Sequence, residues 1–221
     1  MAGRDWLEWH AYYDQPGSSL HRRLAVVQDQ IRRALDRCAP RPIRVVSLCA
    51  GQGRDLLPVL AAHPRGAETT ARLVELEERI ARVAADTARQ EGLDQVQVVV
   101  GDASVTDAYI GAVPADIVIA CGIFGNIADA DIRRFISYLP QLCAGGATVI
   151  WTRTRKAPDI TAAICRWFED AGLDRLAFVA PPEAAYGVAA HRYPGAGRPL
   201  RPGERMFTFV GGSVLRGDKS R

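Results

Sequence analysis

Two hydrophobic patterns alternate along the chain. Short apolar runs rich in β-branched residues are typical of strands buried on both faces, and longer stretches with apolar residues three or four positions apart predict amphipathic helices. The runs that predict strands cover residues 45–48, 71–77, 96–100, 115–120, 147–152, 176–179 and 206–210. The stretches that predict helices cover residues 19–37, 56–63, 78–91, 129–142 and 159–171. This alternation predicts an α/β fold built on a largely parallel sheet.

Two segments fit neither pattern. Residues 103–112 are predicted to form a short irregular helix. Residues 181–204 are rich in Pro and Gly, as loops are, and residues 187–193 within them can pair as an extra strand. A loop of this length inside a compact domain is usually functional.

A glycine turn follows the first predicted strand. Gly51 and Gly53 stand at alternate positions between that strand and the next helical pattern. Because glycine has no Cβ atom, a ligand can approach the backbone closely, and the start of a helix offers unpaired N–H groups. Strand, turn and helix together predict a cradle for a nucleotide.

Carboxylates follow the next two predicted strands. Glu75 lies about 20 residues beyond the glycines, where a βαβ unit places an acid that accepts the ribose hydroxyls. Glu77 and Glu78 belong to the first turn of the next helix, where the helix dipole favours negative charge. Glu75 is still within the strand and would be costly there without partners, so it is the strongest candidate for ligand binding. Asp102 ends the third strand.

This series of motifs resembles the class I S-adenosylmethionine-dependent methyltransferases over residues 43–152. The resemblance places Ser47–Gly53 in the glycine motif, Glu75 at the ribose and Asp102 at the adenine amino group. It places Cys121–Asn126 in the loop beside the methionine moiety and the acceptor. The cofactor-binding residues implied are Ser47, Cys49, Ala50, Gly51, Gly53, Glu75, Leu76, Asp102, Ala103 and Cys121.

The resemblance also implies the fold and marks two departures. The implied fold is a Rossmann-like three-layer sandwich, a seven-stranded, mostly parallel sheet with an antiparallel last strand and helices on both faces. Family members usually carry Asp or Glu where this chain has Ser47, and Gly where it has Cys49. Ser47 can accept a hydrogen bond, but it brings no negative charge to the cofactor's ammonium group.

Composition narrows the class of protein. The 221 residues suffice for one well-buried domain, which we expect over residues 43–215, preceded by a helical and aromatic segment over residues 1–42. Apolar and charged contents of 48% and 24% are ordinary for a globular protein. The net charge is +3, and almost all the positive charge is carried by arginines scattered along the chain, so a nucleic-acid partner is not indicated.

The cysteines and the apolar runs bear on the compartment. Five cysteines without a Cys-x-x-Cys pair fit a reduced, cytosolic chain, and Cys49 and Cys121 are expected to be small buried hydrophobes. No apolar run reaches membrane-spanning length, and the first residues lack the core of a signal peptide. We therefore expect a cytoplasmic protein.

Aromatic residues crowd the first 19 positions. Trp6, Trp9 and Tyr13 recur at helical spacing, with His10 and Tyr12 between them. Two interpretations stay open: the rings dock on the core, or they form a lid over the acceptor pocket.

The acceptor side of the site is less defined. Expected substrate contacts are Tyr12, Tyr13, Phe124, Asn126 and Tyr186. The candidates for a general base are His10 and His191, the latter in the loop after the sixth strand. The chain has neither the Asn/Asp-Pro-Pro-Tyr tetrad of enzymes that methylate bases nor an evident metal site. A metal-independent enzyme acting on a small molecule, as a monomer or homodimer, is expected.

Three functions compete at this point: a methyltransferase, an NAD-dependent oxidoreductase, and a non-methylating protein that binds S-adenosylmethionine on the same fold. Leu56 is too bulky for the third position of the dinucleotide fingerprint, and Asp102 has no role with NAD. Ser47 and Cys49 keep the non-methylating alternative open.

Overall fold

The computed structural model describes residue 15 and residues 17–210. Along the chain, its elements are α2 (Ser19–Arg37), β1 (Ile43–Leu48), α3 (Leu57–Ala62), β2 (Thr69–Glu75), α4 (Glu78–Gln90), β3 (Val96–Val100), the 3-10 helix η2 (Thr106–Tyr109), β4 (Ala115–Ala120), α5 (Asp129–Leu142), β5 (Cys143–Thr154), α6 (Thr161–Asp170), β6 (Asp174–Val179) and β7 (Tyr186–Arg192).

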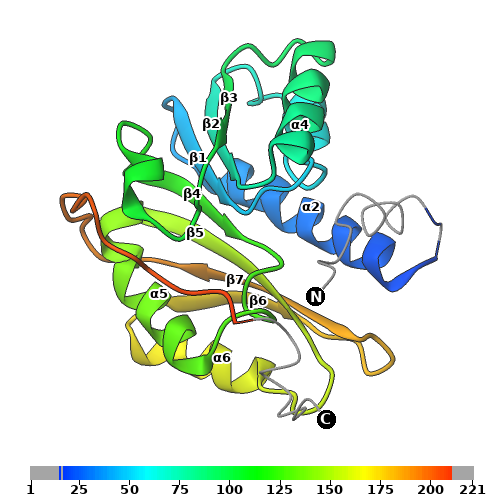
Figure 1. Ribbon diagram of the computed structural model, residues 1–221, viewed down its shortest axis with the longest axis vertical. Coiled ribbons are helices and arrows are strands. Elements are labelled where there is room, and N and C mark those ends of the chain that lie inside the picture. The colour runs from blue at the N-terminus through cyan, green and yellow to red at the C-terminus, as the bar shows by residue number, and fades with distance from the viewer. Residues whose placement is uncertain (1–14, 16, 211–221) are drawn as a thin grey trace.

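The strands form one seven-stranded sheet in the order β3-β2-β1-β4-β5-β7-β6. Strands β1 to β5 pair in parallel, and β7 runs antiparallel to both β5 and β6. Helices α5 and α6 lie on one side of the sheet and α2 and α4 on the other (Figure 1). The expected fold class is confirmed: a three-layer sandwich with an antiparallel last strand.

The central strands explain why the sequence folds in this way. All six residues of β4 are buried, and successive residues of β1 enter opposite cores. Val46 and Leu48 pack toward α5, whereas Ile43 and Val45 pack toward α2. A strand with apolar residues on both faces is stable only between two layers of helices, so the apolar runs led to the correct architecture.

The last strand is where the sequence-based assignment is wrong. Residues 206–210 were expected to form it, but they make a single isolated bridge, between Ile127 and Phe209. The last strand is β7, inserted between β5 and β6 in the segment expected to be mainly loop. Its glycine and alanines have weak strand propensity. The glycine is needed because a Cβ on Gly187 would lie 3.2 Å from side-chain atoms of Phe178 and Thr161.

Helix α2 connects the first described residues to the domain. The Ser18 side chain accepts a hydrogen bond from the backbone N–H of His21 and caps the helix, as its residue type predicts. Its buried face packs against α3 and against β4, β5 and β7. Within the described ranges, no helix combines the length and the apolar character needed to cross a membrane.

Candidate functional site

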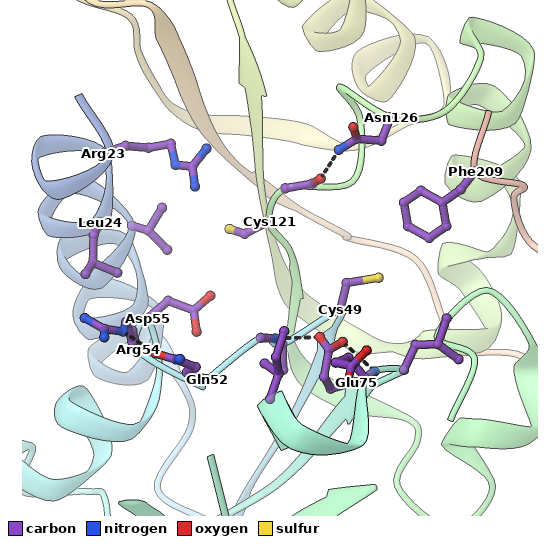
Figure 2. Close-up of a pocket in the computed structure, with 17 residues that line it drawn as sticks. Arg23, Leu24, Cys49, Gln52, Arg54, Asp55, Glu75, Cys121, Asn126 and Phe209 are labelled. Carbon is purple, nitrogen blue, oxygen red and sulfur yellow. Dashed lines mark hydrogen bonds between the residues drawn. The ribbon is translucent and has the colours of Figure 1, made fainter. Parts of the chain in front are cut away.

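A cavity of about 500 Å³ opens at the carboxyl ends of β1, β2 and β4. Its walls come from α2, the turn after β1, the end of β2 with the start of α4, the turn after β4, and Phe209 (Figure 2). The sheet order reverses between β1 and β4, and ligands of open α/β sheets bind at such a switch point. Six of the ten predicted cofactor residues line the cavity: Cys49, Ala50, Gly51, Glu75, Leu76 and Cys121.

The turn after β1 is built from left-handed backbone. Cys49, Gly51 and Gly53 have φ angles of 50°, 57° and 71°. The Ala50 N–H donates to the Val74 carbonyl at 2.9 Å, which holds the turn against β2. Cys49 adopts a conformation that costs a residue with a Cβ atom about 1 kcal/mol, at the position where the resemblance expects glycine.

Gly53 has a different role from the one expected. It does not line the cavity, and a Cβ atom there would lie 2.7 Å from Cδ1 of Leu57 and 3.0 Å from Cδ2 of Leu73. Its small size therefore allows helix α3 to pack on β2, and makes no room for a ligand. Helix α3 is also shorter than predicted and begins at Leu57.

Glu75 is fixed at the rim of the cavity by two backbone donors. Its Oε2 accepts a hydrogen bond from the Gly51 N–H at 2.9 Å, and its Oε1 accepts one from the Glu77 N–H at 3.0 Å. Each carboxylate oxygen can accept a further hydrogen bond. The turn after β1 and the end of β2 are thereby joined through one carboxylate that faces the cavity (Figure 2).

The structure does not bring the other predicted cofactor residues to the cavity wall. Ser47 is buried, and its Oγ has no hydrogen-bond partner among the described residues. Ala103 belongs to the core. Asp102 accepts hydrogen bonds from the backbone and side chain of Ser104 and forms an ion pair with Arg205 at 2.9 Å. Burial opposes its ionisation, but these partners outweigh burial and hold its pKa below the ordinary value.

Three elements of the cavity were missed from the sequence. Helix α2 contributes Arg23 and Leu24, the turn contributes Asp55, and the last described segment contributes Phe209, which is 47% exposed. Leu24 belongs to the apolar spacing of the helix, but nothing local shows that this side of α2 reaches a ligand pocket. The only local signal at Asp55 is an acid directly after the glycine turn.

Asp55 is the most perturbed acid of the cavity. Burial raises the pKa of its carboxyl group to about 6, although nearby backbone N–H groups and Arg23 act in the opposite direction. Its Oδ1 is enclosed and has no hydrogen-bond partner among the described residues.

The two cysteines of the cavity are not nucleophiles. Burial raises the pKa of both thiols, and carboxylates add to the effect: Glu75 and Asp102 at Cys49, and Asp55 at Cys121. Both thiols are therefore neutral near pH 7 and act as small apolar groups.

Of the described residues expected to contact the substrate, only Asn126 lines the cavity, where its Nδ2 donates to the Gly122 carbonyl at 2.8 Å. Phe124 is fully buried, with its ring centroid 5.6 Å from those of Phe135 and Trp151. Tyr186 lies in β7 and packs in the core on the α2 side. The expectation for Phe124 and Tyr186 is wrong because both rings serve packing.

His191 is also misplaced by the sequence-based prediction. It lies in β7, is 0% exposed, and its ring stacks 4.7 Å from Phe168. Its Nδ1 accepts a hydrogen bond from the Trp151 indole N–H at 3.3 Å. Burial, with a contribution from Arg175, lowers its pKa to about 4. A neutral imidazole sealed in the core and away from the cavity cannot act as a general base on a substrate.

The remaining candidates, His10, Tyr12 and Tyr13, lie outside the described residues, as does most of the proposed aromatic lid. Across residue 15 and residues 17–210, no group of three or more His, Cys, Asp or Glu side chains is placed to hold a metal ion.

Comparisons with known proteins place the fold. No protein-family model and no curated protein matches the sequence. Among solved structures, an O-methyltransferase family protein from Burkholderia thailandensis aligns with 80% of this chain at a TM-score of 0.62 and 18% identity. The CurJ carbon methyltransferase aligns with 84% at 0.65 and 15% identity. This chain spans only 57% and 58% of the lengths of those two proteins.

A third similar structure is the magnesium protoporphyrin IX methyltransferase from Synechocystis PCC 6803 with bound S-adenosylmethionine. It aligns with 86% of this chain, which spans 91% of its length, at a TM-score of 0.61 and 14% identity. The chain thus has the fold of S-adenosylmethionine-dependent methyltransferases, and the resemblance found in the sequence is confirmed at the level of the fold.

Proposed function

We propose that this protein binds S-adenosylmethionine in the cavity and transfers its methyl group to a small-molecule acceptor. The observation that carries the proposal is Glu75, whose carboxylate is held by the Gly51 and Glu77 N–H groups at the switch point of the sheet. A carboxylate with two fixed oxygens suits the vicinal hydroxyls of a ribose.

The residues of the cavity fit the cofactor by size and chemistry. A volume of about 500 Å³ lies within the range of small-molecule sites. Gly51 brings the backbone to the wall without a side chain, and the exposed Leu76, at 69%, offers an apolar surface beside Glu75 for a flat base. When bound, S-adenosylmethionine supplies an activated methyl group on a sulfonium. The chain's own task is then to hold the acceptor in line with it.

Asn126 and Phe209 form the part of the cavity wall opposite Glu75 (Figure 2). An amide that can orient a polar group next to an exposed aromatic ring suits a small acceptor with a flat or apolar body. None of the described histidines lines the cavity. If the acceptor must lose a proton, the proton would pass to Asp55, to water, or to some residue outside the described ranges.

An NAD-dependent function is disfavoured by the same turn. Leu56 occupies the third fingerprint position, is fully buried, and fills the space that a dinucleotide site keeps for glycine or alanine.

Calorimetry and labelled methyl transfer test the proposal. We expect S-adenosylhomocysteine and S-adenosylmethionine to bind and NAD not to bind, and we expect label to pass to a member of a panel of hydroxyl, amine and activated-carbon acceptors. Preference for NAD would overturn the proposal. Binding of S-adenosylmethionine with no transfer to any acceptor would favour the non-methylating alternative.

A further inference from the structure

The cavity has two chemically different ends. Glu75 and Cys49 lie at one end, and Asp55, Cys121 and Arg23 face one another at the other (Figure 2). Both oxygens of Glu75 accept backbone hydrogen bonds, as described above. At the second end a carboxylate and a guanidinium occupy facing walls, since Arg23 comes from α2 and Asp55 from the turn after β1.

Asp55 is incompletely satisfied in the free protein. Its Oδ1 is enclosed by the fold, yet no described residue donates a hydrogen bond to it. An enclosed carboxylate oxygen without a donor is costly, and natural proteins rarely keep such atoms without a reason. The side chain also lines the cavity, so a cationic ligand group there would offset the cost of its charge.

The position of Asp55 is held by the surrounding backbone. The Gln28 side chain donates from α2 to the Arg54 carbonyl at 2.9 Å, which ties α2 to the turn immediately before Asp55. On the other side, the Leu56 and Leu57 N–H groups both donate to the Gly53 carbonyl. Asp55 thus stands on a braced turn and faces the cavity in a fixed place.

The charges of this end are complementary to a zwitterion. The methionine moiety of S-adenosylmethionine carries an ammonium and a carboxylate on one carbon atom, so it requires an anion and a cation close together. Ser47, where the resemblance expects an acid, is uncharged and does not reach the cavity. We propose that Asp55 accepts the hydrogen bonds of the cofactor's ammonium group and that Arg23 binds its carboxylate, so that the pair recognises the amino-acid end. This inference rests on the proposed function.

The pH dependence of binding follows from the groups around Asp55. Arg23 faces it from α2, the neutral thiol of Cys121 faces it from the turn after β4, and Arg54 precedes it in the turn after β1, while Glu75 and Glu77 belong to the far wall. With a pKa of about 6 in the free protein, Asp55 is mostly protonated at pH 5 and mostly ionised at pH 7.5. Affinity for an ammonium ligand should therefore rise about tenfold over this range.

The test compares two ligands that differ only at the amino-acid end. S-adenosylhomocysteine carries it, and 5′-methylthioadenosine ends in a methyl group. We expect Asp55→Asn to weaken S-adenosylhomocysteine roughly ten- to a hundredfold and to remove its pH dependence, while affinity for 5′-methylthioadenosine stays within about twofold. Arg23→Gln should likewise weaken binding of S-adenosylhomocysteine more than binding of 5′-methylthioadenosine. Asp86→Asn is the control and should change neither, because Asp86 is a half-exposed acid on α4 that pairs with Arg89.

Each other outcome has one meaning. If the wild-type protein binds neither ligand, the proposed function fails first. If it binds S-adenosylhomocysteine and Asp55→Asn binds it equally well, the inference alone is overturned. Equal losses for both ligands would mean that Asp55 only shapes the turn. Intact affinity with abolished methyl transfer would make it a proton acceptor instead. Circular dichroism of the free variant confirms that it is folded.

Discussion

The cavity end at Asp55 and the aromatic cluster around His191 both contain a buried polar atom without a partner. Oδ1 of Asp55 and Nε2 of His191 are unpaired among the described residues, and burial disfavours the charged form of both groups. Asp55 nevertheless lines a cavity, whereas the rings of Trp151 and Phe168 stack on His191. A perturbed pKa therefore marks a functional group only where a ligand can reach it.

Glu75 is a cavity carboxylate whose two oxygens both accept backbone hydrogen bonds, in contrast to Asp55. We expect Glu75→Ala to weaken S-adenosylhomocysteine by roughly 2–4 kcal/mol, because charge-assisted hydrogen bonds to the ribose are lost. It should also lower the melting temperature, since the Gly51 and Glu77 N–H groups lose their acceptor. Calorimetry and thermal unfolding measure the two effects. Glu78→Ala is a matched control, because Glu78 is exposed and pairs only with Arg82 among the described residues. Affinity unchanged in Glu75→Ala would mean that the ribose lies elsewhere.

His191 should affect stability and leave binding alone. Its folded pKa of about 4 lies below the unfolded value of 6.5, so the unfolded chain binds more protons between these values. The stabilisation is complete above pH 6.5 and is lost as the pH falls toward 4, by up to roughly 3 kcal/mol.

Urea unfolding at several pH values gives the free energy of unfolding of the wild type and of His191→Phe. The difference between the two proteins in the slope of this free energy against pH isolates the contribution of His191. Asp55→Asn should instead make the rise of stability with pH steeper up to about pH 6.5, because ionisation of Asp55 in the folded protein opposes that rise. A His191→Phe variant that loses stability on acidification as steeply as the wild type would contradict the assignment.

Gly53 separates packing from binding within the turn. The added methyl group of Gly53→Ala meets Leu57 and Leu73, and the φ angle of 71° disfavours a Cβ atom. We expect a loss of about 1–3 kcal/mol in the free energy of unfolding. The fraction that remains folded should bind S-adenosylhomocysteine nearly as well as the wild type. Lost affinity in a variant of unchanged stability would restore the direct ligand role expected from the sequence.

Asp55→Asn should have the smallest effect on stability, and in the opposite direction. The folded pKa of about 6 lies above the ordinary value of 3.8, so ionisation of Asp55 destabilises the free protein as the pH rises through this range. The size of the pKa shift limits the stabilisation from removing the charge to roughly 3 kcal/mol at pH 7.5. Because the new amide group needs hydrogen-bond partners of its own, we expect a net gain of about 1 kcal/mol. Thermal unfolding without ligand measures it. Clear destabilisation would make Asp55 a structural residue like His191.

Local patterns led correctly to the architecture and pointed to residues that line the cavity, such as Gly51 and Glu75. The continuous apolar runs of β1 and β4, the glycine turn and the acid that ends β2 depend only on neighbours in the chain. Since parallel strands end at one edge of the sheet, the sequence predicts that Gly51, Glu75 and Cys121 lie close together.

The sequence by itself thus determined the sandwich, the turn and the carboxylate at the end of β2. Tertiary structure alone decided that β7 inserts between β5 and β6, that Arg205 pairs with Asp102 from 103 positions away, and that His191 is sealed against Trp151 from 40 positions away. The physical reason is that periodicity and turn chemistry act between near neighbours. Burial and hydrogen-bond partners, which set a side chain's charge and its access to a ligand, come from segments that only the fold brings together.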